Sequence, residues 1–185
     1  MGNVHYRAMD ELEAALDDIR QSPQDEGILE LIVRRPAVDE REVLEEGELD
    51  LVEGLVGDTW RTRGSGSTPD GSSHPDMQLT LMNARIIAFL AQDKERWPLA
   101  GDQLFVDMDL SVANLAPGTR LAIGSAVVEV TAKPHTGCAK FTARFGMDAM
   151  KFVNSPVGRQ LNLRGINAKV VQPGTMRAGD LVKKI

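Results

Sequence analysis

The chain has 185 residues and a mass of 20.2 kDa, the upper end of the range for one compact domain, so we expect a single domain with one core. Hydrophobic residues make up 42% and charged residues 26%, and no apolar run approaches the roughly 18 residues of a membrane span. The N-terminus is acidic where a secretory signal would be apolar, which predicts a cytoplasmic protein with no membrane partner. The single cysteine, Cys138, excludes an internal disulfide and a thiolate zinc cage.

Charge is distributed unevenly along the chain. Residues 1–60 hold 17 acidic and 5 basic residues, whereas residues 61–185 hold 10 acidic and 16 basic residues. A basic block within an acidic protein is able to bind an anionic ligand, although charges also lie on solvated faces for solubility alone. The isoelectric point of 5.1 and the aromatic content of 4% argue against a nucleic-acid partner.

The first 60 residues predict an acidic portion, made of helices and a strand, that packs on the rest of the domain. Apolar residues recur at helical spacing between Asp10 and Arg20, and Asp10 is the expected N-cap, with Glu13 three residues later. ILELIV, residues 28–33, is a strand candidate. DEREVLEE, residues 39–46, predicts a second short helix that ends at Gly47.

Residues 61–185 begin with a flexible loop and continue as a series of short strands. GSGSTPDGSS, residues 64–73, cannot pack a core, and it is either an inert connection or a lid. Residues 79–90 are ambiguous between helix and strand, and few long helices are expected. Strands are expected at 104–107 and at 166–171, and RLAI-GS-AVVEV, residues 120–130, predicts a tight hairpin. A closed β-barrel with peripheral helices, a mainly β or α+β fold, leaves no exposed strand edges.

Cys138 lies in TAKPHTGCAKF, beside several cations. Pro134 and Gly137 predict a loop or barrel rim there, and His135, Lys133, Lys140 and Arg144 would favour the reactive thiolate. A lone cysteine without such neighbours is usually a small buried hydrophobe. Three classes of function fit the residues: a cysteine hydrolase activated by His135, a non-catalytic interaction module, and a thiolate that is a soft ligand to a metal in an organic cofactor.

The C-terminal half resembles the MOSC domain, the family of the molybdenum cofactor sulfurase C-terminal domain, in its stand-alone bacterial form. The matching pieces cover residues 80–185 and follow the family order: Gly101-Asp102, the stretch 115–124 leading into a hairpin, Cys138 in a P-x-x-G-C-x-K-F context, Arg164-Gly165 and Gly179-Asp180. EGLVGDTWRTRG, residues 53–64, resembles the strand and loop that begin many members.

The resemblance implies a barrel that binds molybdenum cofactor (molybdopterin) or handles sulfur for it. Cys138 matches the family cysteine and would be the metal ligand or the sulfur carrier, and thus the catalytic residue. Three further residues match the family only as basic residues: Lys140, Arg144 and Arg164. Unless they are ordinary surface charges, they would screen the cofactor phosphate, with His135 as a further cofactor-binding residue. Asn83 and the segment 74–78 could line the same opening or form a structural loop.

Two departures from the family narrow the expected activity. The chain lacks the aminotransferase-like domain that supplies pyridoxal phosphate chemistry, so we expect neither that cofactor nor desulfurase activity. It also has SSHPDMQ where some members have a His-Gly-Gly loop. What remains is a small oxidoreductase of N-hydroxylated substrates, supplied with electrons by redox partner proteins, or a cofactor or sulfur carrier that works with a cysteine desulfurase.

Overall fold

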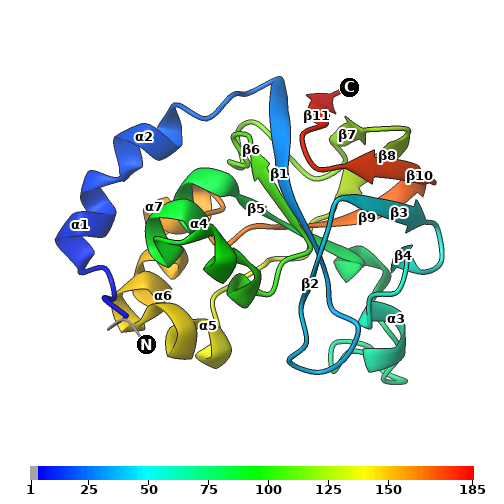
Figure 1. Ribbon diagram of the computed structural model, residues 1–185, viewed down its shortest axis with the longest axis horizontal. Helices are drawn as coiled ribbons and strands as arrows, with labels where there is room; N and C mark the ends of the chain where they lie inside the picture. The colour runs from blue at the N-terminus through cyan, green and yellow to red at the C-terminus, as the bar shows by residue number, and fades with distance from the viewer. Residues whose placement is uncertain (1–3) are drawn as a thin grey trace.

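The computed structural model describes residues 4–185, and its centre is a closed β-barrel (Figure 1). Around the barrel the strands follow the order β11-β7-β8-β9-β5-β6-β1, and β1 then pairs with β11 to close it. Neighbours are antiparallel except β5 and β6, which are parallel. The strands are β1 (Glu26–Arg34), β5 (Leu79–Asn83), β6 (Leu104–Asp107), β7 (Arg120–Ile123), β8 (Ala126–Val130), β9 (Ile166–Gln172) and β11 (Leu181–Lys184).

The predicted barrel with peripheral helices is therefore confirmed, and so is the hairpin at residues 120–130. β7 and β8 pair antiparallel from Arg120 with Glu129 to Ile123 with Ala126, on either side of the Gly124-Ser125 turn. Five of the seven barrel strands lie after residue 100. β1 also belongs to the barrel, so the first 60 residues supply a barrel strand as well as elements that pack on the barrel.

Two layers of apolar side chains result from the alternation of residues along the strands. On β6, Leu104 and Val106 point into the barrel interior, whereas Phe105 between them faces outward against the helices. β5 divides in the same way, with Leu81 inside and Met82 outside. The outer layer is covered by α1 (Met9–Ala14), α2 (Leu16–Arg20), α4 (Ala84–Ala91), η2 (Lys94–Ala100), α5 (Ala139–Phe145), α6 (Met147–Asn154) and α7 (Pro156–Gln160).

These helices gather on one side of the barrel, and a small second sheet lies on the other (Figure 1). The second sheet has the order β10-β3-β4, from β10 (Gly174–Arg177), β3 (Glu46–Asp50) and β4 (Gly54–Leu55). Two short helices, α3 (Trp60–Arg63) and η1 (Pro75–Met77), flank the segment 64–74, which forms no helix or strand, as expected for a loop. Within residues 4–185, none of the helices has the length and apolar character needed to cross a membrane.

The predicted helix at residues 39–46 is wrong. This segment forms β2 (Glu42–Leu44) and the start of β3, because Val43 and Leu44 pair with the free edge of β1. Leu44 also packs against the barrel core. Such pairing is a contact between distant residues, and it outweighs the weak helical preference of a short acidic run.

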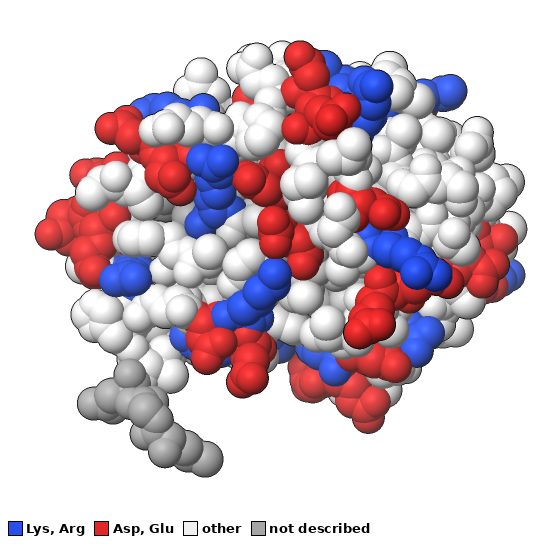
Figure 2. All heavy atoms as spheres, turned by 45° about the horizontal axis from the view of Figure 1, so that its top comes forward, with Lys and Arg blue, Asp and Glu red and all other residues white. Residues whose placement is uncertain are grey.

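The N-terminal helix is confirmed, but its cap is not the predicted one. The helix begins at Met9 and is divided at Ala15 into α1 and α2. Ala8 is the N-cap residue, and its N–H donates to the Glu11 side chain at 2.9 Å, so Asp10 and Glu13 do not form the expected capping box. Asp10, Glu13, Asp17 and Asp18 are exposed, and on the face shown in Figure 2 acidic and basic side chains are interspersed.

Candidate functional site

A pocket beside the barrel brings all five predicted site residues together. Cys138, His135, Lys140, Arg144 and Arg164 line a single cavity of about 230 Å³. We call it the cation pocket, because six of its lining side chains are cationic and no Asp or Glu is among the lining residues that the structure describes. The six cations are Arg35, Arg41, Arg63, Lys140, Arg144 and Arg164.

Cys138 stands at the mouth of this pocket as the N-cap residue of α5, with its side chain exposed. Asn154 on α6 holds the loop before it, because the Gly137 N–H donates to Asn154 Oδ1 at 2.9 Å and Asn154 Nδ2 donates to the Gly137 carbonyl at 3.2 Å. The thiol is therefore presented to solvent on a fixed loop rather than packed in the core. This placement agrees with the predicted loop or rim.

A buried carboxylate, Asp102, orders two of the site residues. Asp102 is fully buried, and its Oδ1 lies 3.0 Å from His135 Nε2 while its Oδ2 accepts from Arg164 at 2.7 Å. Arg164 also donates to the Ala100 carbonyl at 2.9 Å. Burial raises the pKa of Asp102, but Arg164 and His135 lower it more, and the net pKa is about 2. Asp102 is therefore ionised at neutral pH and fixes both partners.

The ionised Asp102 also sets the tautomer of His135. A carboxylate only accepts hydrogen bonds, so Nε2 carries the proton and Nδ1 of the neutral ring is an acceptor. Burial lowers the pKa of His135, and the charge of Arg164 lowers it further, although Asp102 acts in the opposite direction. At neutral pH the pocket therefore contains an uncharged imidazole with one free lone pair.

A second buried ion pair fixes Arg35, which also lines the cation pocket. Asp58 accepts from Arg35 Nε at 2.9 Å and from its NH2 at 2.7 Å, and its side chain is fully buried. Arg35 also donates to the Gly101 carbonyl at 3.1 Å, next to Asp102. Burial raises the pKa of Asp58, but hydrogen bonds and charge from Arg35 lower it overall. Arg35 and Arg164 are therefore each fixed by a buried carboxylate that does not itself line the pocket.

The cations at the mouth are less fully neutralised. Asp39 Oδ1 lies 3.6 Å from both Lys140 Nζ and Arg144, and the Asp39 side chain is 65% exposed, which makes these weak contacts. Burial lowers the pKa of Arg41, and the like charges of Arg144 and Arg35 lower it further. This mutual repulsion would be relieved by an anionic ligand.

His135, whose side chain is 17% exposed, predicts a pH dependence of stability. Because its pKa in the folded state lies below the ordinary 6.5, the unfolded chain takes up a proton first as the pH falls. The stabilisation is thus complete above pH 6.5 and declines below it. Denaturant midpoints at about pH 7.5 and about pH 5 should show a loss of stability in the parent and a smaller loss in His135→Gln. Equal losses in the two proteins would contradict this role.

Several pocket residues were not predicted from the sequence. Arg35, Arg41 and Arg63 lie far from Cys138 in sequence, and Asp58 lies behind them. The only signal for Asp102 was its place in the Gly-Asp pair. Of the residues whose role the sequence left open, His74 and Met77 from the segment 74–78 line the pocket. Gly64 and Ser65 from the predicted loop line it as well.

Asn83, in contrast, is not part of the site. It is buried and caps α4, accepting from the Arg85 N–H at 2.8 Å and donating to Ser22 at 2.8 Å.

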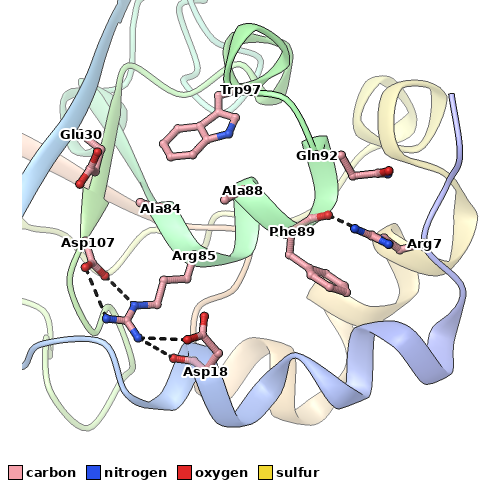
Figure 3. A pocket seen from close by; sticks show the side chains of 10 residues that line it. All are labelled: Arg7, Asp18, Glu30, Ala84, Arg85, Ala88, Phe89, Gln92, Trp97 and Asp107. Carbon is pink, nitrogen blue, oxygen red and sulfur yellow. Dashed lines mark hydrogen bonds and ion pairs between the residues drawn. The ribbon is translucent and has the colours of Figure 1, made fainter. Parts of the chain in front are cut away.

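A larger hollow of about 570 Å³ lies between α4 and the N-terminal helices, but its charges are already paired (Figure 3). Figure 3 shows Arg85 bound to both Asp107 and Asp18, at 2.8 and 3.4 Å, and Phe89 and Trp97 line the same hollow. Its lining includes none of the residues around Cys138. The cluster of six cations without an acidic residue among the described lining, together with the thiol, therefore favours the cation pocket as the functional site.

Comparisons with known proteins agree with this fold. The YUAD protein from Bacillus subtilis is similar, with a TM-score of 0.60 and 14% identity over 86% of this chain and 95% of that one. YiiM from Escherichia coli is similar with a TM-score of 0.54 and 20% identity, over 85% of this chain and 69% of that one. Comparison with curated proteins gives no match. The family model of the MOSC domain matches residues 72–183, more than half of the chain, which therefore belongs to the MOSC domain family.

Proposed function

We propose that this chain binds a molybdenum cofactor in the cation pocket, with Cys138 as the metal ligand or sulfur carrier. The observation that carries the proposal is an exposed thiol at the mouth of a pocket with six cationic side chains and no acidic lining residue among those described. A thiolate is a soft ligand that suits a transition metal, and guanidinium groups suit a phosphate. The residues present therefore fit both ends of an anionic pterin cofactor.

Different residues would hold different parts of this ligand. Cys138 supplies a single sulfur, so the remaining metal ligands would come from the organic cofactor and solvent. Arg63 and Arg144 would screen the phosphate, whereas Arg35 and Arg164 already serve the carboxylates of Asp58 and Asp102. When bound, the cofactor would supply two-electron redox chemistry.

The proposed activities are the reduction of N-hydroxylated substrates and the carriage of sulfur or cofactor. Reduction of an N–OH group takes two electrons and two protons and gives N–H and water, so it needs a redox partner protein and a proton source. His135 Nδ1 would take a proton from solvent and pass it on, while Asp102 keeps Nε2 protonated. Sulfur carriage would instead need only the exposed Cys138 and a cysteine desulfurase as donor.

The other two classes have weaker support. A cysteine hydrolase needs the thiol within hydrogen-bond reach of its base. Within residues 4–185, no hydrogen bond joins the Cys138 thiol to His135, whose Nε2 is bound to Asp102. An interaction module would not require a thiol to face a group of cations.

Neutralising a cation at the mouth should weaken cofactor binding. A charge-assisted contact is worth roughly 1.5–3 kcal/mol, so we expect Arg144→Gln and Arg63→Gln each to lower affinity about tenfold to a hundredfold. Retention of molybdenum would be measured during dialysis at low and moderate salt. Arg164 is a poor choice here, because its loss leaves Asp102 unpaired.

Arg177→Gln is the matched control, because Arg177 is exposed and pairs with Glu46 outside the pocket. It should retain molybdenum like the parent. If Arg144→Gln and Arg63→Gln behave like this control, the cation pocket does not hold the phosphate.

A further inference from the structure

The connection between β1 and β2 brings an acidic side chain to the cation pocket. This connection is residues 35–41, and its first and last residues, Arg35 and Arg41, both line the pocket. Arg35 is held by the carboxylate of Asp58, and Arg41 Nε donates to the Pro98 carbonyl at 3.3 Å. The connection is therefore fixed at both ends beside the pocket.

Asp39 lies within this connection, in a tight turn. The Glu40 N–H closes the turn by donating to the Ala37 carbonyl at 3.2 Å. Asp39 has a φ of +60°, in the left-handed region that aspartate and asparagine adopt more readily than most other residues. An asparagine at this position would therefore keep the backbone conformation and remove only the charge.

The carboxylate of Asp39 contacts two of the six cations of the pocket. Its Oδ1 lies 3.6 Å from Lys140 Nζ and 3.6 Å from a terminal nitrogen of Arg144, too far for a hydrogen bond. Within residues 4–185, these contacts are the only ion pairs that Lys140 and Arg144 make. Asp39 is not among the lining residues, so it neutralises part of the charge of the pocket from outside.

A bound anion would need the same two cations. A phosphate that accepts hydrogen bonds from Lys140 and Arg144 makes shorter and stronger contacts than those of Asp39. It would also bring a second negative charge close to Asp39, and like charges repel. The Asp39 side chain is 65% exposed, so its own contacts are weak and are given up at little cost. The two anions therefore cannot both be held at full strength.

We infer that Asp39 competes with the ligand anion for Lys140 and Arg144 and thereby sets the affinity of the cation pocket. The inference rests on the proposed function in one respect, that the pocket binds an anion. Asp39 gives up its two contacts when the ligand anion enters, and it takes them again when the anion leaves. This exchange lowers the affinity and eases release, which suits a protein that hands its cofactor on.

Binding of inorganic pyrophosphate to the full chain tests the inference without any metal. In calorimetric titrations at low salt, Asp39→Asn should bind pyrophosphate roughly three- to tenfold more tightly than the parent, the effect of two exposed ion pairs that no longer have to be broken. The difference should shrink at moderate salt, because these charges are screened. In the ¹⁵N-labelled parent, pyrophosphate should shift the amide resonances of residues 37–40 as well as those of residues 138–144.

Glu40→Gln is the matched control. It removes the same charge from the same turn, but within residues 4–185 the exposed Glu40 side chain forms no ion pair with a cation of the pocket. It should bind pyrophosphate nearly as the parent does. In a Lys140→Gln background, the gain from Asp39→Asn should be smaller, because one of the two contested cations is gone.

The possible outcomes separate this inference from the proposed function. If the parent binds pyrophosphate and Asp39→Asn binds it no more tightly, or if Glu40→Gln gives an equal gain, the competition is refuted while the proposed cofactor site stands. If no variant binds pyrophosphate, both are contradicted. Tighter binding by Asp39→Asn in a chain that never acquires molybdenum would support the competition and refute the cofactor.

Discussion

Replacing Asp102 with alanine is expected to lower the free energy of unfolding by about 3–5 kcal/mol, because it leaves a buried guanidinium without its counterion. Arg164 is 7% exposed at its side chain and donates to Asp102 at 2.7 Å, and His135 would lose its acceptor as well. Denaturation in urea or guanidinium chloride, followed by circular dichroism, measures the change. The variant should also lose the fixed orientation of Arg164 and His135.

An exposed aspartate is the control for this prediction. Asp25 pairs with Lys184 at 2.9 Å, but its side chain is 83% exposed, so Asp25→Ala should cost no more than about 1 kcal/mol. Equal costs for the two variants would mean that Asp102 is not the organising group of the pocket.

Replacing Cys138 with alanine is expected to remove stably bound molybdenum while leaving the fold intact. The side chain is exposed and belongs to neither apolar layer of the core, so its truncation creates no cavity. His135 would not be a metal ligand, and within residues 4–185 no hydrogen bond joins it to Cys138, so its loss should weaken metal binding less than loss of the thiol does. His135→Gln should therefore retain part of the metal, and Cys138→Ala should retain none.

This pair of variants also separates the proposed function from a hydrolase. A cysteine hydrolase would lose nearly all turnover with either substitution, and its metal content would be unaffected by both. Metal content and thermal unfolding, measured on the same preparations, distinguish loss of a ligand from loss of the fold. Equal molybdenum content in Cys138→Ala and in the parent would mean that the Cys138 thiol does not bind the metal.

The parts of the fold that depend on residues close together in the sequence were predictable from it. The hairpin at residues 120–130 is formed by two apolar runs and a two-residue turn, all contiguous in sequence, and the strand at 104–107 follows the same logic. Residues 39–46 could not be read in this way, because their strand exists only through pairing with the edge of β1. The ambiguous stretch 79–90 contains both a strand and a helix, because β5 ends at Asn83 and α4 begins directly after it.

The candidate site shows the same difference between residues close together in the sequence and residues far apart. Cys138, His135, Lys140 and Arg144 lie within one short segment, so their common location was visible in the sequence. Arg35 directly follows β1 and Arg63 ends α3, and contacts between residues distant in sequence, such as the Thr59 N–H donating to the Arg35 carbonyl, bring them to the same pocket. The pairing of Asp102 with Arg164 joins residues 62 positions apart. Neither residue type nor spacing could indicate that both would be buried.

Elemental analysis of the purified chain tests the central claim most directly. The protein would be produced in a host grown with ample molybdate, and a molybdoenzyme from the same cells would confirm that cofactor was being made. Binding through one thiolate predicts about one molybdenum per chain, accompanied by phosphorus from the cofactor. Background levels of both elements in this chain, with Cys138 still freely alkylated and the control enzyme fully loaded, would contradict the account.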